Sequence, residues 1–167
     1  MVRGMIRHFS GKNEEAIEDF RKASKNDALT IQALSYMSKC CNALERYEDA
    51  VGYAELGLSM NPEFYNLNVN RGVAYYKMTK YNLAIEDFKK VIAKKNYVNT
   101  AALGSAYMFR GMTYDRLDQK EEAVNDYKMA LMYADNEKIR KRMAELELQI
   151  EAAKPKQKFS FKKLFGK

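Results

Sequence analysis

A pentapeptide that recurs at a fixed spacing constrains this chain more than any other feature of its sequence. AIEDF occurs at residues 16–20 and again at 84–88, and the related AVGYA occupies 50–54, midway between them. A fourth variant, AVNDY, begins at Ala123, five positions later than this even spacing predicts, which implies a short insertion. Such a period indicates a stack of similar units, each of which buries its apolar face against its neighbours.

A second element recurs before these pentapeptides. RGMIRHF, RGVAYYKM and RGMTYDRL begin at Arg3, Arg71 and Arg110, and each places a glycine twelve positions before the alanine of the following pentapeptide. The matching place in the second unit reads MSKCCNAL from Met37, with serine in place of glycine. Small residues at a fixed spacing let two helices approach closely where they face each other, and the accompanying aromatic residues fill the space around the crossing. The pattern therefore predicts stacked helical hairpins.

The composition agrees with an all-α fold. Eight glycines and two prolines are too few turn residues for a β-sandwich or β-barrel, and 47% of the residues are apolar, as in a folded soluble protein. The apolar residues of one unit follow the spacing of a single helix face: Ala84, Ile85, Phe88, Val91 and Ile92. We therefore expect a chain made of helices.

The net charge of +7 is concentrated at the C-terminal end, where six lysines and no acidic residue lie between residues 154 and 167. Residues 1–153 are close to neutral, so attraction to an anionic surface would come from this end of the chain. No stretch reaches the length and apolarity of a membrane helix, and the first residues lack the apolar region of a signal peptide. We expect a cytoplasmic protein.

The repeating pattern resembles the tetratricopeptide repeat family over residues 1–135. The third unit carries the small, aromatic, alanine and aromatic positions of that family as Gly72, Tyr75, Ala84 and Phe88. The resemblance implies a right-handed superhelical solenoid of four helical hairpins followed by a capping helix. The expected hairpins are 1–28, 29–62, 63–96 and 97–135, the capping helix is 136–153, and a basic flexible tail is 154–167.

Two units depart from the family pattern. The second unit has Cys41 and Ala54 at the two aromatic positions and Gly57 at a usual alanine position. In the first unit, Arg7 stands where an aromatic residue is usual. These two units therefore match the family at fewer positions than the third and fourth units do.

The hydrophobic spacing predicts nine helices. The insertion falls in KKNYVNTAALG, where it is expected to lengthen the loop or the start of the following helix, with Asn99 or Thr100 as the cap. The last predicted helix has one apolar face and charges elsewhere, which suits a cap for a solenoid. The predicted helices span about 1–9, 13–25, 29–42, 47–60, 63–77, 81–94, 99–117, 120–133 and 137–153.

Motifs for catalysis are absent from the sequence. His8 is the only histidine, and there is no phosphate-binding glycine loop, no serine nucleophile motif and no zinc-ligand spacing. Cys40 and Cys41 are adjacent, so on a helix they point in different directions. We expect one buried and one half-exposed thiol rather than a redox pair. The sequence therefore predicts no enzyme activity, no metal and no cofactor.

The resemblance implies a non-catalytic protein–protein interaction scaffold that binds a peptide or helix of a partner in its concave groove. The middle units supply amides, aromatic rings and two lysines, and the fourth unit supplies an apolar floor, whose Met and Phe residues have an alternative role in packing against the capping helix. Some family members clamp a C-terminal carboxylate, and only a fragment of that clamp is present, Lys39 and Asn70. The candidate partner-binding residues are Tyr36, Lys39, Asn42, Asn66, Val69, Asn70, Val73, Tyr76, Lys77, Met108, Phe109 and Met112.

The tail supports an alternative function. Its lysines alternate with Phe159, Phe161, Leu164 and Phe165, a pattern found in peripheral membrane or nucleic-acid adaptors. In this alternative the tail is the binding element and the repeats are a spacer. Contact with an anionic membrane is the secondary expectation for the tail, and nucleic acid is not an expected partner.

Self-association through the N-terminal repeat is a further prediction. Met1, Val2, Met5 and Ile6 have no preceding hairpin to cover them. An uncovered apolar helix face either frays or becomes buried against another copy of the protein.

Overall fold

The computed structural model describes residues 1–154, and it confirms the predicted all-α solenoid. In this range the chain forms nine α-helices, one short 3₁₀-helix and no β-strand. Each predicted helix is present, and its boundaries lie within two positions of the predicted ones. The helices are α1 Val2–Phe9, α2 Asn13–Ala23, η1 Asp27–Leu29, α3 Thr30–Ala43, α4 Tyr47–Met60, α5 Tyr65–Lys77, α6 Tyr81–Ala93, α7 Thr100–Arg116, α8 Lys120–Tyr133 and α9 Glu137–Ala153.

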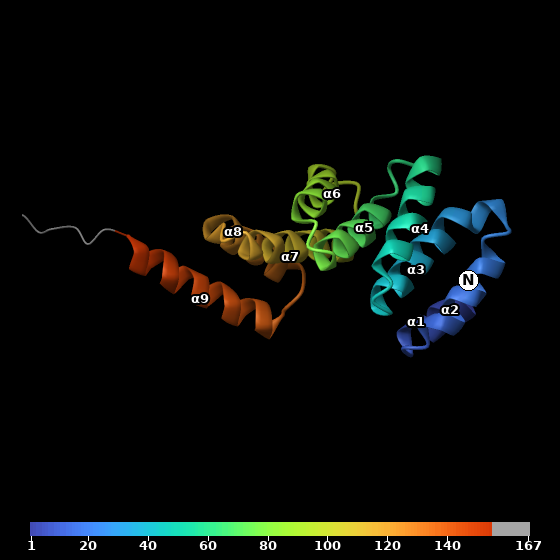
Figure 1. The fold of residues 1–167 in the computed structure, drawn as a ribbon, viewed down its shortest axis with the longest axis horizontal. Helices are drawn as coiled ribbons and strands as arrows, with labels where there is room; N and C mark the ends of the chain where they lie inside the picture. Colours follow the sequence, from blue (N-terminus) through green and yellow to red (C-terminus); the bar gives the residue numbers. More distant parts are fainter. Residues whose placement is uncertain (155–167) are drawn as a thin grey trace, which may run out of the picture.

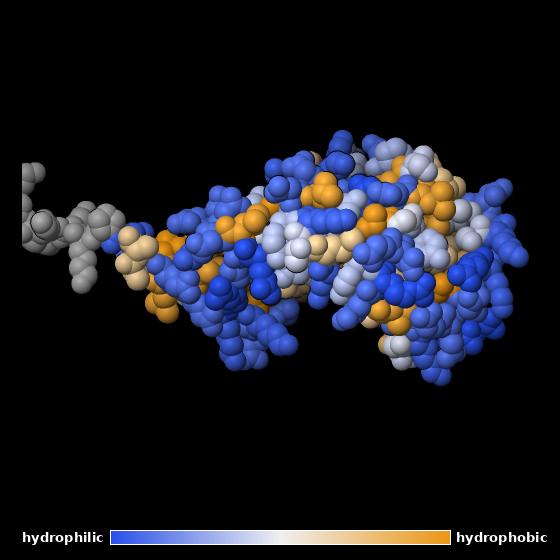
Figure 2. Space-filling model, viewed as in Figure 1, coloured by the Kyte–Doolittle hydropathy of each residue, from blue (hydrophilic) through white to orange (hydrophobic). Residues whose placement is uncertain are grey.

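The helices form two layers along the chain (Figure 1). Helices α3, α5 and α7 contact one another in order, and α4, α6 and α8 each pack against the helix that precedes them. Helix α9 packs on α8 at the end of the array. Figure 2 shows that the surface is hollowed on one side, between the α1–α2 end and the α9 end. The first helices of successive hairpins line this hollow side.

The insertion lengthens helix α7. This helix has 17 residues, whereas the equivalent helix α5 has 13. The extra turn is at the N-terminus, because α7 begins eleven positions before Gly111, whereas α5 begins only seven positions before Gly72. Asn99 caps the longer helix, since its Oδ1 accepts a hydrogen bond of 2.8 Å from the backbone N–H of Ala102. Of the two predicted caps, Asn99 is therefore the correct one.

The two helices of a hairpin meet where a glycine faces an aromatic ring. A Cβ atom added to Gly72 would lie 2.6 Å from Cε1 of Phe88, so only glycine fits at this separation. The nearest atoms to this Cβ belong to the ring rather than to Ala84, the small residue expected at the crossing. The same contact recurs in the first and fourth hairpins, as Gly4 with Phe20 and Gly111 with Tyr127.

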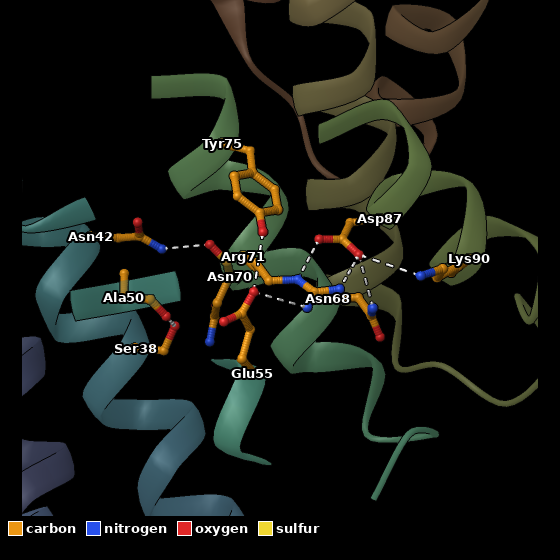
Figure 3. A network of polar contacts seen from close by, with 10 residues as sticks. All are labelled: Ser38, Asn42, Ala50, Glu55, Asn68, Asn70, Arg71, Tyr75, Asp87 and Lys90. Carbon is orange, nitrogen blue, oxygen red and sulfur yellow. Dashed lines mark hydrogen bonds and ion pairs between the residues drawn. The ribbon is translucent and has the colours of Figure 1, made fainter. Parts of the chain in front are cut away.

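The second hairpin solves the same packing problem with different residues. Ala54 replaces the aromatic ring, and Ser38 replaces the glycine. The Ser38 hydroxyl donates a buried hydrogen bond of 2.7 Å to the backbone carbonyl of Ala50 (Figure 3). Ser38 is larger than the glycine of the other hairpins, and Ala54 is smaller than their aromatic residue. The two differences offset each other and keep the interior filled.

An arginine and an aspartate sixteen positions apart join the two helices of three hairpins. In the third hairpin, Arg71 Nε and Nη2 donate hydrogen bonds of 2.8 Å each to the two carboxylate oxygens of Asp87 (Figure 3). This bidentate geometry is the strongest form of an arginine–carboxylate pair. The same pair occurs in the first and fourth hairpins, as Arg3 with Asp19 and Arg110 with Asp126.

The aspartates of the first and fourth hairpins have pKa values shifted in opposite directions. The hydrogen bond from Arg3 is the main cause that lowers the pKa of Asp19, and Arg7 adds a second hydrogen bond of 2.8 Å. Asp126 has only Arg110 as a cationic partner among the described residues, and burial raises its pKa despite that arginine. The Arg7 that breaks the aromatic pattern of the first unit thus stabilises the charged form of Asp19.

The second hairpin lacks both members of this pair. The equivalent positions are Met37, which is buried, and Tyr53, which is half-buried against the same apolar cluster. A buried carboxylate without its arginine would be costly, so the two charged residues are absent together. The fixed spacing between the RG element and the aspartate of each pentapeptide is visible in the sequence, but the spacing alone does not show that the two side chains meet.

The glycine contact predicts opposite effects for two glycines within helices. Gly72→Ala should lower the free energy of unfolding by about 1 to 3 kcal/mol, because the new methyl group overlaps Phe88. Gly52→Ala should raise it by up to about 1 kcal/mol, because open space surrounds Gly52 and alanine favours the helix. Urea denaturation followed by circular dichroism measures both changes. Shifts of the same sign would contradict the proposed crossing.

The arginine–aspartate pair predicts non-additive changes in stability. Arg71→Met should lower the free energy of unfolding by about 3 kcal/mol, because Asp87 keeps a charge that is buried and loses its main partner. The double variant Arg71→Met with Asp87→Tyr, which copies the second hairpin, should lose less than the single variant does. Arg21→Met serves as the control, since the exposed pair of Arg21 with Glu18 contributes at most about 1 kcal/mol. Equal losses in the single and double variants would contradict this account of the pair.

Candidate functional site

The hollow side contains a pocket of about 310 Å³ between α3, α5 and the first turns of α7. Four amide side chains and a lysine give this pocket a polar lining, and we call it the amide pocket. The lining includes five of the predicted partner-binding residues: Tyr36, Lys39, Asn66, Val69 and Asn70. The structure therefore brings together residues that come from two different repeats of the sequence.

Hydrogen bonds fix the amides of this region. The Asn70 Nδ2 donates to the backbone carbonyl of Ser35 at 2.8 Å. The Asn42 Nδ2 donates to the backbone carbonyl of Asn70 at 2.8 Å (Figure 3). At the other wall, Asn99 Nδ2 donates to Asn66 Oδ1 at 3.2 Å. Among residues 1–154, no hydrogen bond engages Asn70 Oδ1 or Asn66 Nδ2, so one acceptor and one donor remain for a ligand. Asn42 joins α3 to α5 and does not line the amide pocket.

The other predicted residues of the amide pocket have distinct environments. Val69 is buried at its base. Tyr36 is half-buried and stacks on Phe20, with 4.9 Å between the ring centroids. Lys39 is exposed, and no carboxylate of residues 1–154 lies within 4.0 Å of its Nζ. The pocket thus has an apolar base, an aromatic wall and a cation without a partner in the described part of the chain.

Two predicted aromatic anchors pack between helices. Tyr76 is 8% exposed, and its ring meets the edge of Phe109 at a centroid distance of 5.8 Å. Phe109 in turn stacks on Phe88 at 6.3 Å. Neither ring lines the amide pocket, although Tyr76 borders a separate pocket described below. Their removal would therefore disturb the packing between the third and fourth hairpins.

The remaining predicted residues lie outside the amide pocket. Val73 packs against the core cluster of the third hairpin, and Lys77 is exposed at the last position of α5. Met108 and Met112 are half-buried and pack against a cluster that includes Ile139 and Leu146 of α9. These two methionines thus take part in the packing of α7 against the cluster formed by α8 and α9.

A second pocket is lined by charged residues. It is a cavity of about 660 Å³ between α5, α7 and α9, and we call it the Arg142 pocket. Arg142 Nε and Nη2 donate hydrogen bonds of 2.8 Å each to the carboxylate of Asp115. The Tyr127 hydroxyl also donates to Asp115 at 3.3 Å. The hydrogen bond from Arg142 is the main cause that lowers the pKa of Asp115, and burial raises the pKa of Tyr127. This pair joins α9 to α7, and no sequence signal points to it because Arg142 lies outside the register of the repeats.

Both cysteines are buried, so the expectation of one half-exposed thiol was wrong. Cys40 lies at the contact with the first hairpin, where its Sγ is 3.4 Å from His8 Nδ1. Burial is the main cause that raises the pKa of Cys40 to about 12 and that of Cys41 to about 11. Both thiols belong to a core cluster that includes residues of the first and second hairpins, which is why both are enclosed.

The described residues 1–154 contain neither a metal-binding cluster nor a membrane-spanning helix. No group of three or more His, Cys, Asp or Glu side chains in this range is arranged to hold a metal ion. No helix in the same range is long and apolar enough to cross a membrane.

Comparisons with known proteins agree with this architecture. A curated relative in Schizosaccharomyces pombe, DnaJ homolog subfamily C member 7 homolog, is 25% identical over 93% of this chain. The chain spans 35% of the length of that relative. Among solved structures, the tetratricopeptide repeat protein TTC0263 of Thermus thermophilus has a TM-score of 0.74 at 19% identity, over 90% of this chain and 80% of that one. The first tetratricopeptide repeat domain of human RPAP3 has a TM-score of 0.64 at 21% identity, over 74% and 94%.

A further similar structure is the first repeat domain of Spaghetti (RPAP3) bound to the HSP90 peptide SRMEEVD, with a TM-score of 0.64 at 22% identity over 72% of this chain and 93% of that one. The fold shared with these structures is thus a solenoid of stacked helical hairpins. A family model described as "Tetratricopeptide repeat" matches residues 1–28, 65–93 and 104–137, and the chain belongs to the tetratricopeptide repeat family. The unmatched residues 29–64 contain the hairpin in which serine, alanine, methionine and tyrosine replace the residues of the other hairpins.

The lowered pKa of Asp115 predicts how its contribution to stability depends on pH. A carboxylate whose folded pKa is lowered stabilises the protein above its unfolded pKa, and this contribution is lost as the pH falls through the folded value. Asp115→Asn should therefore lower the free energy of unfolding at pH 7, and the loss should shrink as the pH falls below about 4. Urea denaturation of both proteins at a series of pH values measures this difference. Asp118→Asn, at an exposed aspartate, is the control and should change the free energy of unfolding little at any of these pH values. If the loss of stability in Asp115→Asn did not depend on pH, the proposed role of the Arg142–Asp115 pair would be wrong.

Proposed function

We propose that this chain is a non-catalytic scaffold that binds an extended segment of a partner protein on its hollow side. The amide pocket carries the proposal, because it gathers Tyr36, Lys39, Asn66, Val69 and Asn70 from two helices. An extended peptide presents alternating N–H and C=O groups, and amide side chains bind both kinds. The open acceptor of Asn70 and the open donor of Asn66 match this alternation.

Pre-ordering of the pocket favours binding. The amides of Asn66 and Asn70 already have hydrogen-bond partners within the protein, so little side-chain entropy is lost when a peptide binds. The peptide-bound Spaghetti domain shows that a domain of similar fold binds a short peptide, and it supports the choice of a peptide as the ligand. The proposed partner-binding set is accordingly narrower than the sequence predicted, since Tyr76 and Phe109 pack between the third and fourth hairpins.

Two other predictions about partners stand apart from this proposal. The alternative function through the tail depends on residues 155–167, which lie outside the described residues. Self-association through the N-terminal repeat stays a prediction. Of the four residues that motivated it, Met1 and Met5 are half-buried against a core cluster, whereas Val2 and Ile6 belong to an exposed stripe on α1. The stripe consists of Val2, Ile6 and Phe9, which are 72%, 61% and 74% exposed.

Selection of peptides from a random dodecapeptide display library on the full chain tests the proposed function. We expect enriched peptides whose affinity falls at least about tenfold for the double variant Lys39→Ala with Asn66→Ala, because two polar contacts are lost. The matched double variant Lys22→Ala with Asn82→Ala removes the same two kinds of side chain from exposed positions outside the amide pocket. Fluorescence anisotropy measures the affinities. Failure to enrich any peptide, or equal affinity for the two double variants, would contradict the proposal.

A further inference from the structure

The lengthened helix α7 creates an apolar pocket next to the amide pocket. This cavity of about 340 Å³ lies between the first half of α7, the end of α8 and the start of α9, and we call it the α7–α9 pocket. Met108, Leu131 and Ile139 contribute to its mainly apolar lining. Gly104 lets the end of α8 approach, because a Cβ at this position would lie 2.8 Å from Cβ of Tyr133. Gly104 is in the part of the chain that contains the insertion, so the pocket depends on a segment that is longer in the fourth hairpin than in the third.

The α7–α9 pocket adjoins both polar pockets of the hollow side. Ala101 and Ser105 line it together with the amide pocket, since they stand on the α7 ridge between the two. Ile139 lines it together with the Arg142 pocket. A chain segment lying along the hollow side would therefore cross a polar pocket, an apolar pocket and a second polar pocket in that order.

The polar pockets on either side carry cations that lack carboxylate partners. Within residues 1–154, no Asp or Glu oxygen lies within 4.0 Å of the side-chain nitrogens of Lys39 in the amide pocket, or of Arg116 and Lys138 in the Arg142 pocket. The acidic residues that line the Arg142 and α7–α9 pockets are already paired: Asp115 with Arg142, Asp118 with Lys120, and Asp135 with Arg140. The unbalanced charge on both sides of the apolar pocket is therefore positive.

We propose that the partner segment has an aliphatic side chain that enters the α7–α9 pocket and carboxylates on both sides of it, one toward Lys39 and one toward Lys138. This inference rests on the proposed function and specifies the chemistry of its ligand. Burial of one aliphatic side chain supplies affinity, whereas the flanking charges select the partner and speed association. The lysine-rich tail of this chain is not the occupant, because its charge has the same sign as that of the pockets.

Three labelled peptides and the full chain test this proposal by fluorescence anisotropy. The probe is DEDLEDE with glycine–serine ends, the second peptide has serine in place of the leucine, and the third has lysine in place of every acid. We expect the probe to bind, the serine peptide to bind at least about tenfold more weakly, and the lysine peptide not to bind. Ala101→Leu should weaken probe binding to a similar extent by filling the mouth of the α7–α9 pocket, and Lys138→Glu should weaken it most at low salt.

Matched variants make the test specific. Ala144→Leu on the exposed side of α9 and Lys22→Glu on α2 repeat the two substitutions at exposed positions outside the three pockets, and both should bind the probe as the unmodified chain does. A probe that does not bind, a serine peptide that binds equally well, or an Ala101→Leu variant that behaves like Ala144→Leu would each overturn the proposal. If library peptides still depend on Lys39 and Asn66 while Ala101→Leu has no effect on them, only this inference fails. If no peptide depends on Lys39 and Asn66, the proposed function fails as well.

Discussion

The close approach of two helices at a glycine is the constraint on which the rest of this structure depends. With only 2.6 Å between a hypothetical Gly72 Cβ and the Phe88 ring, the hairpin has one separation at which its interior is filled without overlap. The same contact recurs in the first and fourth hairpins, and the first helices α3, α5 and α7 contact one another in order along the array. The hollow side, and the pockets on it, are the surface that these helices leave uncovered.

Charge is distributed according to the same geometry. Inside the hairpins, Asp87 and its counterparts are buried and meet an arginine at a fixed spacing, so their charges are neutralised within the fold. The second hairpin shows that the pair is dispensable if both members change together, as they do in Met37 and Tyr53. On the hollow side the balance is different, since Lys39, Arg116 and Lys138 have no such partners among the described residues. Charges that stabilise the fold are thus paired, and those available to a ligand are not.

A small change in the repeat length gives the fourth hairpin a pocket of its own. The insertion adds a turn to the start of α7, and that turn meets the end of α8 at Gly104 and Tyr133. An apolar cavity forms there beside an amide-lined one, because the extra turn has no counterpart in the third hairpin. The repeated hairpins form the hollow side, and the insertion in the fourth hairpin adds an apolar pocket to it.

The sequence by itself determined the helices and their order, because these depend on local spacing: the apolar residues along each helix and the recurrence of the glycine and the pentapeptide. It also indicated a small residue at each crossing, but it assigned Ala84 as the residue that faces Gly72, and the structure places the Phe88 ring there. It further narrowed the cap of the lengthened helix to Asn99 or Thr100, and the structure shows that the Asn99 side chain accepts the backbone N–H of Ala102. Only the tertiary structure decided which groove residues are accessible. Tyr76 and Phe109 occupy groove positions in the repeat, yet their rings fill the space between the third and fourth hairpins, which depends on the volumes of residues on both sides. The pairing of Arg142 with Asp115 was likewise set by how α9 docks on the array, since no repeat spacing relates these two residues.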